Sequence, residues 1–312
     1  MMEDSLNILT VSFWPDACRC LLLYESILKF GKGKINWYLV VDDEDYERFL
    51  GLFKKRWKPI LIKKSKIVGK EAYQELERKG WLLQQFVKIL FAREFEGRSY
   101  VNVDSDVFFC NQFSYKDFFK DNKIYLNKRM YKTGGKVNLN VFRFYKSQKL
   151  IFGKIIKRTY SKAPTYMGPL IMWDSKLVKE IISLIEKKYK LSFIDAILEN
   201  LEFGWEFSEY FLYGVFLEEY KKCKFIIKNN LEISHCIYHT GVDPNKVLLD
   251  KDEIRDKIAI LVQSNCDINP RLYCDIINID SKTKRKIGLI YQPKGINIKK
   301  ILEEQKKLMM VD

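Results

Sequence analysis

The first sixty residues alternate between short apolar runs and predicted helices, and this order constrains the fold more than any other feature. Apolar runs at 6–13, 35–41 and 59–62 are predicted to be buried strands. Helices are predicted between them, at about 16–30 and 46–55. Strands that are joined through helices lie parallel in one sheet. We therefore expect an α/β fold with a mainly parallel sheet, whose ligands bind beyond the carboxyl ends of the strands.

The sequence Asp104-Ser105-Asp106 follows the next apolar run, 101–103, so that two carboxylates leave the end of a buried strand. Ionised carboxylates separated by one residue repel each other and are costly to desolvate, which indicates a cation nearby. Carboxylate oxygens suit Mg²⁺ or Mn²⁺, and a metal with open positions can take the phosphates of a nucleotide. A solvated turn would use the same residue types, so the flanking segments have to decide.

One flanking segment is the predicted helix 81–94, which is apolar nearly all round and should be deeply buried. Gln84, Gln85 and Lys88 form a polar stripe on it, because residues four apart share a helix face. The lysine could reach a diphosphate or a sugar hydroxyl, or it could pair internally with a loop of the protein.

Downstream of the Asp-Ser-Asp sequence, the pattern predicts a second group of elements. Short strands are expected within 123–145 around a Gly-Gly pair, and a helix is expected after Ser208, with Glu209 in its first turn. A strand at 232–238 should end at His239. An antiparallel pair of strands is expected near 271–280 and 286–291.

Composition and charge limit where the protein can be located and what it can bind. The 312 residues are 47% hydrophobic, enough for a sizeable core, and no apolar run approaches the roughly 18 residues of a membrane span. The net charge of +15 gathers at 54–66 and 282–307, where it would attract polyanions. The segment 298–309 predicts an amphipathic helix that either lies on an anionic membrane or docks on its own domain. We expect a cytoplasmic protein that could contact the inner membrane face peripherally, and nucleic acid is not an expected partner.

The parallel-sheet half, the helix carrying Gln84, Gln85 and Lys88, and the strand ending at Asp104-Ser105-Asp106 together resemble the GT-A fold glycosyltransferases. Bacterial members that build surface polysaccharides, such as lipopolysaccharide or capsule, are similar in these motifs. The resemblance covers about residues 6–240 and implies a Rossmann-like sheet flanked by helices. It also implies a nucleotide-sugar-binding half at 1–130, a smaller acceptor-binding half at 131–245 and a basic extension at 246–312.

The resemblance implies a metal-dependent transfer from a nucleotide-sugar donor to a glycan or lipid-linked glycan acceptor. Asp104 and Asp106 would hold Mn²⁺ or Mg²⁺, with His239 as the third ligand. The positions that would bind the donor are Ser12, Phe13, Asp42, Asp43, Gln84, Gln85, Lys88, Asp104 and Ser105. The metal would neutralise charge on the departing nucleoside diphosphate.

An inverting mechanism also needs a carboxylate to take the proton of the acceptor hydroxyl, whereas a retaining one does not. Glu209 is the first candidate for this base, and Glu206 and Asp174 follow.

Two other interpretations of the sequence stay open. A phosphohydrolase of the haloacid dehalogenase type also places an Asp-x-Asp at a strand end, although normally on the first strand. A non-catalytic polyanion-binding protein would depend on the lysine clusters alone.

Overall fold

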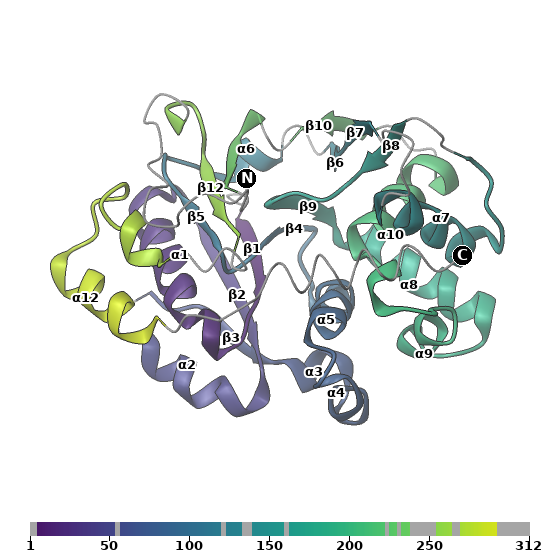
Figure 1. The fold of residues 1–312 in the computed structure, drawn as a ribbon, viewed down its shortest axis with the longest axis horizontal. Coiled ribbons are helices and arrows are strands. Elements are labelled where there is room, and N and C mark those ends of the chain that lie inside the picture. The colour runs from purple at the N-terminus through teal and green to yellow at the C-terminus, as the bar shows by residue number, and fades with distance from the viewer. Residues whose placement is uncertain are drawn as a thin grey trace. The chain divides into compact units, whose positions relative to one another are not determined.

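The computed structural model describes residues 5–53, 57–119, 123–132, 139–158, 162–221, 225–229, 232–237, 254–263 and 269–291. It is a mixed α/β structure that divides into two compact units (Figure 1). Unit 1 comprises Met1–Trp14, Lys32–Asp104 and Phe113–Glu232. Unit 2 comprises Pro15–Gly31, Ser105–Gln112 and Ile233–Asp312.

The central sheet of unit 1 has five strands in the order β3-β2-β1-β4-β9. Their bounds are β1 (Leu6–Val11), β2 (Ile35–Val41), β3 (Ile60–Lys63), β4 (Ser99–Val103) and β9 (Leu170–Asp174). The first four strands are parallel to their neighbours, and β9 runs antiparallel to β4 at the edge. The predicted, mainly parallel sheet is therefore confirmed.

The four parallel strands end at one edge of this sheet, because they all run in the same direction. Ser12 follows β1, Asp42 follows β2, Lys64 follows β3 and Asp104 follows β4. Three of these four residues have ionisable side chains, whereas the strands that precede them are largely apolar. This edge is where ligands of open α/β sheets bind.

Unit 1 contains nine α-helices among the described residues. They are α2 (Tyr46–Leu52), α3 (Lys64–Val68), α4 (Lys70–Leu76), α5 (Gly80–Glu94), α6 (Tyr115–Phe118), α7 (Leu139–Phe152), α8 (Ser175–Tyr189), α9 (Phe193–Leu198) and α10 (Glu209–Val215). Helix α5 packs against β1, α3, α4, α8 and α10. The prediction of a buried helix is confirmed for most of α5, but Trp81 in its first turn is 45% exposed.

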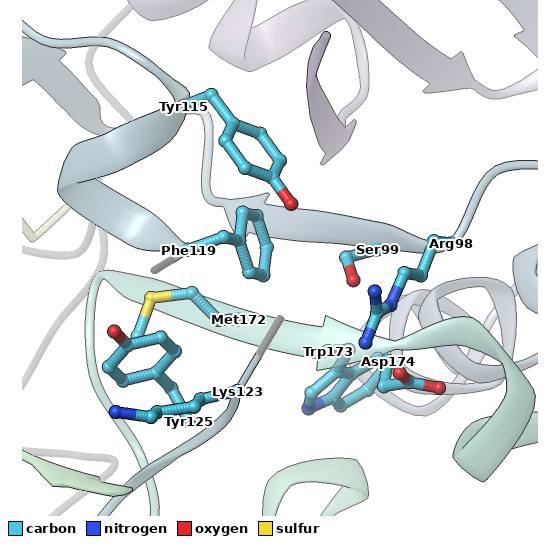
Figure 2. A pocket seen from close by; sticks show the side chains of 9 residues that line it. All are labelled: Arg98, Ser99, Tyr115, Phe119, Lys123, Tyr125, Met172, Trp173 and Asp174. Atoms are coloured by element: carbon cyan, nitrogen blue, oxygen red, sulfur yellow. The ribbon is translucent and has the colours of Figure 1, made fainter. Parts of the chain in front are cut away.

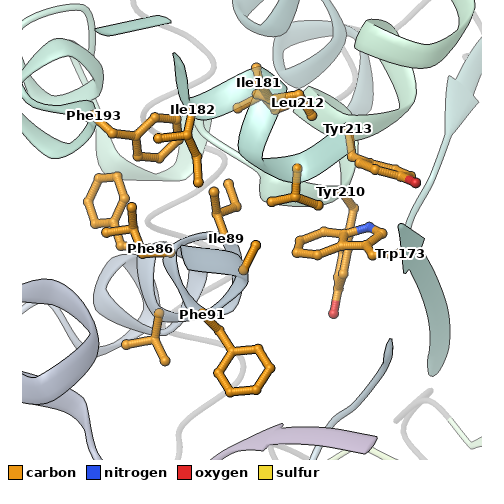
Figure 3. Close-up of a cluster of buried hydrophobic side chains, with 14 of the residues drawn as sticks. Phe86, Ile89, Phe91, Trp173, Ile181, Ile182, Phe193, Tyr210, Leu212 and Tyr213 are labelled. Carbon is orange, nitrogen blue, oxygen red and sulfur yellow. The ribbon is translucent and has the colours of Figure 1, made fainter. Parts of the chain in front are cut away.

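The core of unit 1 forms where α5 meets α8, α9 and α10 (Figure 3). Phe86 of α5 meets Phe193 of α9 edge to face, with 6.3 Å between ring centroids. Trp173 of β9 packs edge to face on Tyr210 of α10, with 5.9 Å between centroids. Buried aromatic pairs of this kind contribute stability beyond the area that they bury, so α10 is held firmly against α5 and β9.

Two short sheets complete unit 1, and here the sequence-based prediction was partly wrong. Strand β6 (Ile124–Asn127) pairs with β10 (Phe225–Lys228), and β7 (Arg129–Lys132) pairs with β8 (Lys162–Thr165). The predicted strands within 123–145 are confirmed up to residue 132, but 139–145 belongs to helix α7. This helix buries Phe144, Gln148 and Ile151, which share one face at helical spacing.

Unit 2 contains α1 (Ala17–Phe30), β5 (Val107–Phe109), β11 (Ser234–Ile237), β12 (Ala259–Val262) and α12 (Ser281–Ile290). Strand β12 pairs antiparallel with β5 and parallel with β11. The strands predicted near 271–280 and 286–291 are wrong: this region holds a 3₁₀ turn (Pro270–Tyr273) and helix α12. Asp280 caps α12 by accepting a hydrogen bond from the Thr283 backbone, which favours a helix.

Among the helices that the structure describes, none is long and apolar enough to cross a bilayer. The predicted amphipathic helix 298–309 lies outside the described residues, as do the Gly-Gly pair at 134–135 and most of the basic extension beyond α12.

Candidate active site

Asp104 and Lys88 form an ion pair at the carboxyl end of β4. The Lys88 Nζ lies 2.7 Å from Asp104 Oδ1. The lysine side chain is 5% exposed and comes from α5, whereas the aspartate side chain is 32% exposed. The pairing to a loop that the sequence left open for Lys88 is therefore present, and its partner is the first carboxylate of the Asp-Ser-Asp sequence.

Two residues of α10 complete the surroundings of the Lys88 ammonium. Its Nζ donates a hydrogen bond to Tyr210 Oη at 2.8 Å and lies 3.4 Å from Glu209 Oε1. Burial opposes the charge of Lys88, but attraction from Asp104, Tyr210 and Glu209 holds its pKa well above the ordinary value. The lysine is therefore a permanent cation at neutral pH, held by three oxygen atoms.

Glu209 is almost fully buried beside this cation. Burial raises the pKa of its carboxyl group and Asp104 adds to the effect, while Lys88 offsets part of it. The Glu209 backbone N–H donates to Gln85 Oε1 at 3.2 Å, which ties the start of α10 to α5. The structure thus brings together Lys88, Asp104, Glu209 and Gln85, four of the residues that the sequence singled out.

The end of β1 lies under the same helix. Gln84 Nε2 donates to the Val11 carbonyl at 3.4 Å, so that Gln84 joins α5 to the last residue of β1. Ser12, the next residue, is buried, and Phe13 is 37% exposed. These positions lie on the same sheet edge as Asp104, because β1 and β4 are parallel neighbours.

Asp42 and Asp43 follow β2, and side chains at the start of α3 engage both of them. Lys64 Nζ lies 2.7 Å from Asp42 Oδ1, with the lysine 5% exposed. Ser65 donates to Asp43 through its backbone at 3.1 Å and through its hydroxyl at 2.5 Å. Burial raises the pKa of Asp42, and Lys64 opposes this shift. The two acids therefore fix the loop after β2, and Lys64 is a structural residue rather than part of a solvated basic cluster.

The other residues of the Asp-Ser-Asp sequence belong to unit 2. The Ser105 hydroxyl donates to Asp16 Oδ2 at 3.3 Å, and Asp16 forms a 3.0 Å ion pair with Arg19. The Asp106 carbonyl accepts a hydrogen bond from the Val262 backbone at 2.9 Å. Asp106 lines a small pocket of unit 2 together with Arg19 and Tyr273.

Glu206 and Asp174, the other two candidates for the general base, make structural contacts away from Lys88. Glu206 forms a 3.0 Å ion pair with Lys146 and accepts hydrogen bonds from the backbone of residues 202 and 203. Asp174 caps α8 by accepting from the backbone of residues 176 and 177. It is paired with Ser99 across the sheet, at the opposite end of β4 from Asp104. The structure therefore does not bring Asp174 to the Lys88 cluster.

Asp174 instead lines a separate pocket at the beginning of β4 (Figure 2). The lining combines basic and aromatic side chains from β4, β6, β9, α6 and the residues next to them: Arg98, Ser99, Tyr115, Phe119, Lys123, Tyr125, Met172, Trp173 and Asp174.

The predicted third metal ligand, His239, lies outside the described residues. Within the described part of the chain, no group of three or more His, Cys, Asp or Glu side chains is arranged to hold a metal ion. The described side chains alone therefore do not make up a complete metal site.

Two residues of this region were missed from the sequence. Tyr210 gives Lys88 its third oxygen contact, and its position directly after Glu209 in the first turn of α10 was the available signal. Arg143 of α7 is a buried arginine whose pKa burial lowers to about 10, against the influence of Glu209. The helical spacing of apolar residues around Arg143 would have revealed α7, but the region was interpreted as strands.

The described residues define an α/β protein with a central, mostly parallel sheet and a charged cluster at the carboxyl ends of its strands. A family model matches residues 8–270, and the chain belongs to this family, DUF6492, a family of unknown function. No curated protein matches the chain. Among solved structures, the apo form of mouse xyloside xylosyltransferase 1 is similar at a TM-score of 0.49 and 8% sequence identity, over 84% of this chain and 99% of that one.

Proposed function

We propose that this protein is a metal-dependent glycosyltransferase of the GT-A type, which moves a sugar from a nucleotide-sugar donor to a glycan or lipid-linked glycan acceptor. The observation that carries the proposal is the Lys88–Asp104 ion pair, with Glu209 beside it, at the carboxyl end of a central parallel strand. Burying two carboxylates around one cation lowers the stability of a protein unless every charge is paired, so such clusters often mark functional sites. Asp104 is partly exposed, which leaves this cluster accessible to a ligand.

The residues fit a divalent cation. One oxygen of Asp104 meets Lys88, while its Oδ2 makes no hydrogen bond to any described residue, and about a third of the side chain is accessible. Carboxylate oxygen is the ligand type that Mg²⁺ and Mn²⁺ prefer, and the carboxylate of Asp106, two residues further on in the sequence, is the proposed second ligand. When bound, such a metal would neutralise charge on the leaving nucleoside diphosphate.

Lys88 would act as a positioning residue. Because its ammonium is buried and held by Tyr210 and Glu209, it fixes the orientation of the Asp104 carboxylate. A rigid carboxylate loses less conformational entropy when it binds a ligand, which favours affinity.

Glu209 is the proposed general base for an inverting transfer. Its pKa lies above the ordinary value because of burial, which brings it closer to the pH at which it would accept a proton. The carboxylates of Glu206 and Asp174 accept hydrogen bonds from nearby backbone N–H groups, so both are weaker candidates for the base than Glu209. Ser12 and Phe13, at the end of β1, remain the proposed contacts of the nucleobase.

Thermal unfolding with nucleotides tests the proposal. The melting temperature of the intact protein would be measured with UDP, GDP, CMP and ADP, each with and without Mn²⁺. Binding to the folded state alone raises the melting temperature, so one nucleotide with Mn²⁺ should stabilise the protein, and EDTA should remove the effect. Stabilisation by heparin without any metal, and by none of the nucleotides, would instead support a polyanion-binding protein.

Variants localise the effect to the Asp-Ser-Asp sequence. Asp106→Ala and Asp104→Asn should each abolish the metal-dependent stabilisation. Asp275→Asn is a matched control, because this carboxylate is 75% exposed and pairs only with Lys284 among the described residues. Unchanged nucleotide binding in Asp106→Ala would refute the metal assignment.

We also propose cytoplasmic localisation, with peripheral contact to an anionic membrane through the basic residues beyond α12. Ile287 of α12 is fully buried in unit 2, so a truncation must preserve this helix. Removing residues 292–312 and measuring sedimentation with anionic liposomes tests the contact. Liposome binding that survives the truncation would contradict it.

A further inference from the structure

Arg143 is a buried guanidinium that meets no carboxylate among the described residues. Its side chain lies on α7 and is 7% exposed. Its Nε donates to the Trp205 carbonyl at 3.2 Å, and its Nη1 lies 3.2 Å from Met167 Sδ. The buried cations Arg19, Lys64 and Lys88, in contrast, each meet an aspartate within 3.0 Å. A buried charge without an anion is costly, which indicates that an anion is missing.

Two further donors in the same region have no acceptor within the described part of the chain. They are Gln85 Nε2 and Trp205 Nε1, and both atoms are buried. The Gln85 amide orientation is set by its Oε1, which accepts from the Glu209 backbone, so that its Nε2 faces away from this bond. Buried polar atoms are nearly always hydrogen-bonded, so unpaired donors indicate a ligand rich in acceptors.

These three donors belong to one neighbourhood. The Arg143 guanidinium lies over the ring of Trp81, 5.2 Å from its centroid, and Trp81 is one helical turn from Gln85 on α5. The Trp205 carbonyl accepts from Arg143 directly. Helix α10, which carries Glu209, packs on both α5 and α7. Burial lowers the pKa of Arg143, and the charge of Glu209 opposes this shift.

Aromatic rings border these donors. Trp81 is 45% exposed, Phe203 is 45% exposed and Phe142 is 37% exposed. Trp205 stacks on Phe203 with 5.6 Å between centroids and 10° between planes, and it meets Phe142 edge to face at 5.6 Å. Exposed aromatic rings offer a flat apolar surface for the C–H face of a sugar ring, while nearby donors bind its oxygens.

We propose that Arg143, Gln85 and Trp205 bind an oxyanion on the acceptor sugar, either a carboxylate or a phosphate, with the sugar ring against the exposed aromatic side chains. The inference rests on the proposed function, because it specifies the acceptor of the same site. A guanidinium pairs with carboxylate and phosphate through two parallel hydrogen bonds, which gives both affinity and selection against neutral sugars.

Tryptophan fluorescence tests the proposal, since Trp81 and Trp205 lie at the site. The intact protein would be titrated with glucose, glucuronate, glucose 6-phosphate and inorganic phosphate, without nucleotide. At least one anionic sugar should bind about tenfold or more tightly than glucose, as expected for a charge-assisted hydrogen-bond pair. Comparison of glucuronate with glucose 6-phosphate identifies the anion, and phosphate alone should bind more weakly than the preferred sugar. Equal binding of glucose and both anionic sugars would overturn the proposal.

Two variants assign the binding to these residues. Arg143→Lys keeps the charge but loses the planar fork and should weaken binding about tenfold or more. Trp205→Phe removes one donor and keeps the ring, so it should weaken binding severalfold and provides a second test if Arg143→Lys does not fold. Arg93→Lys is the matched control, because Arg93 is partly exposed on the same helix α5 and pairs with Glu186. Wild-type affinity in both site variants would overturn the proposal.

The outcomes separate this inference from the proposed function. Asp104→Asn should lose the metal-dependent nucleotide effect and keep the anionic-sugar binding, whereas Arg143→Lys should do the reverse. Anionic-sugar binding that depends on Arg143, without any nucleotide effect in the wild type, would refute the transferase and keep the oxyanion site. Loss of nucleotide binding in Arg143→Lys would mean that Arg143 serves the donor, which overturns the acceptor assignment.

Discussion

The ammonium of Lys88 lies between the carboxylates of Asp104 and Glu209, 2.7 Å from the first and 3.4 Å from the second. The two acids belong to distant parts of the sequence, yet they share one buried cation. Each carboxylate would otherwise repel the other in a poorly solvated place, so Lys88 is the residue that allows them to coexist.

Lys88→Met should therefore destabilise the protein strongly. The variant keeps the volume of the side chain but leaves Glu209 buried without its cation, which is expected to cost about 3–5 kcal/mol in the free energy of unfolding. Urea denaturation measures the change. In the double variant Lys88→Met/Glu209→Gln the uncompensated charge is gone, so it should be more stable than Lys88→Met alone. A double variant that is less stable than the single one would show that Glu209 does not depend on Lys88.

The raised pKa of Glu209 predicts a pH dependence of stability. Between its ordinary value of 4.5 and its higher value in the fold, the folded protein retains a proton that the unfolded chain releases. The contribution of this carboxyl group is therefore complete below 4.5 and is lost as the pH rises through the pKa in the fold.

The wild type should consequently lose stability relative to Glu209→Gln as the pH rises above 4.5, whatever the absolute stabilities of the two proteins are. Urea midpoints of both proteins at a series of pH values measure the difference, and titrating groups that do not interact with Glu209 cancel in the comparison. Parallel pH curves for the two proteins would contradict the raised pKa.

Lys64→Ala should destabilise the protein because it removes the cation from Asp42. This lysine is 5% exposed and its partner is 17% exposed, so the loss is expected to be about 3 kcal/mol. The neighbouring Lys63 is exposed, and Lys63→Ala should change stability by less than about 0.5 kcal/mol. Similar effects of both substitutions would mean that the Asp42 pair is not structural.

Gly214→Ala tests the packing of α10. A Cβ atom at this position would overlap the ring of Tyr166, which is buried and whose hydroxyl donates to Glu218 at 2.5 Å. The ring cannot move aside freely, so we expect a loss of about 1–3 kcal/mol in the free energy of unfolding.

Gly80→Ala is the control for this substitution. No heavy atom lies within 4 Å of a Cβ built at Gly80, at the start of α5. The change should be neutral or stabilise the protein by up to about 1 kcal/mol, because alanine restricts the unfolded chain. A Gly214→Ala variant as stable as Gly80→Ala would show that α10 can shift away from Tyr166.

Much of the fold could be predicted from local patterns. The order of apolar runs and helices in the first sixty residues determined a parallel sheet, because strands separated by helices have few other arrangements. That Asp104 lies at the same sheet edge as Asp42 was decided by the structure, in which β4 is parallel to β1. The prediction failed at α7, whose helical spacing was interpreted as strands. It also failed at α12, where polar residues leave few apolar positions and the helix is stabilised largely by what it packs against.

The candidate site, like the fold, could be predicted only in part. By itself, the sequence determined that Asp104 ends a buried strand and that Lys88 lies on a buried helix, because both statements depend only on neighbouring residues. Only the tertiary structure decided that Lys88 meets Asp104, Glu209 and Tyr210. It alone decided that Arg143 is buried with no carboxylate in contact among the described residues. Such contacts join positions as much as 122 residues apart, as for Lys88 and Tyr210, and no local pattern encodes them. They arise when α5, α7 and α10 pack together, which buries their apolar faces and brings their few polar side chains into contact.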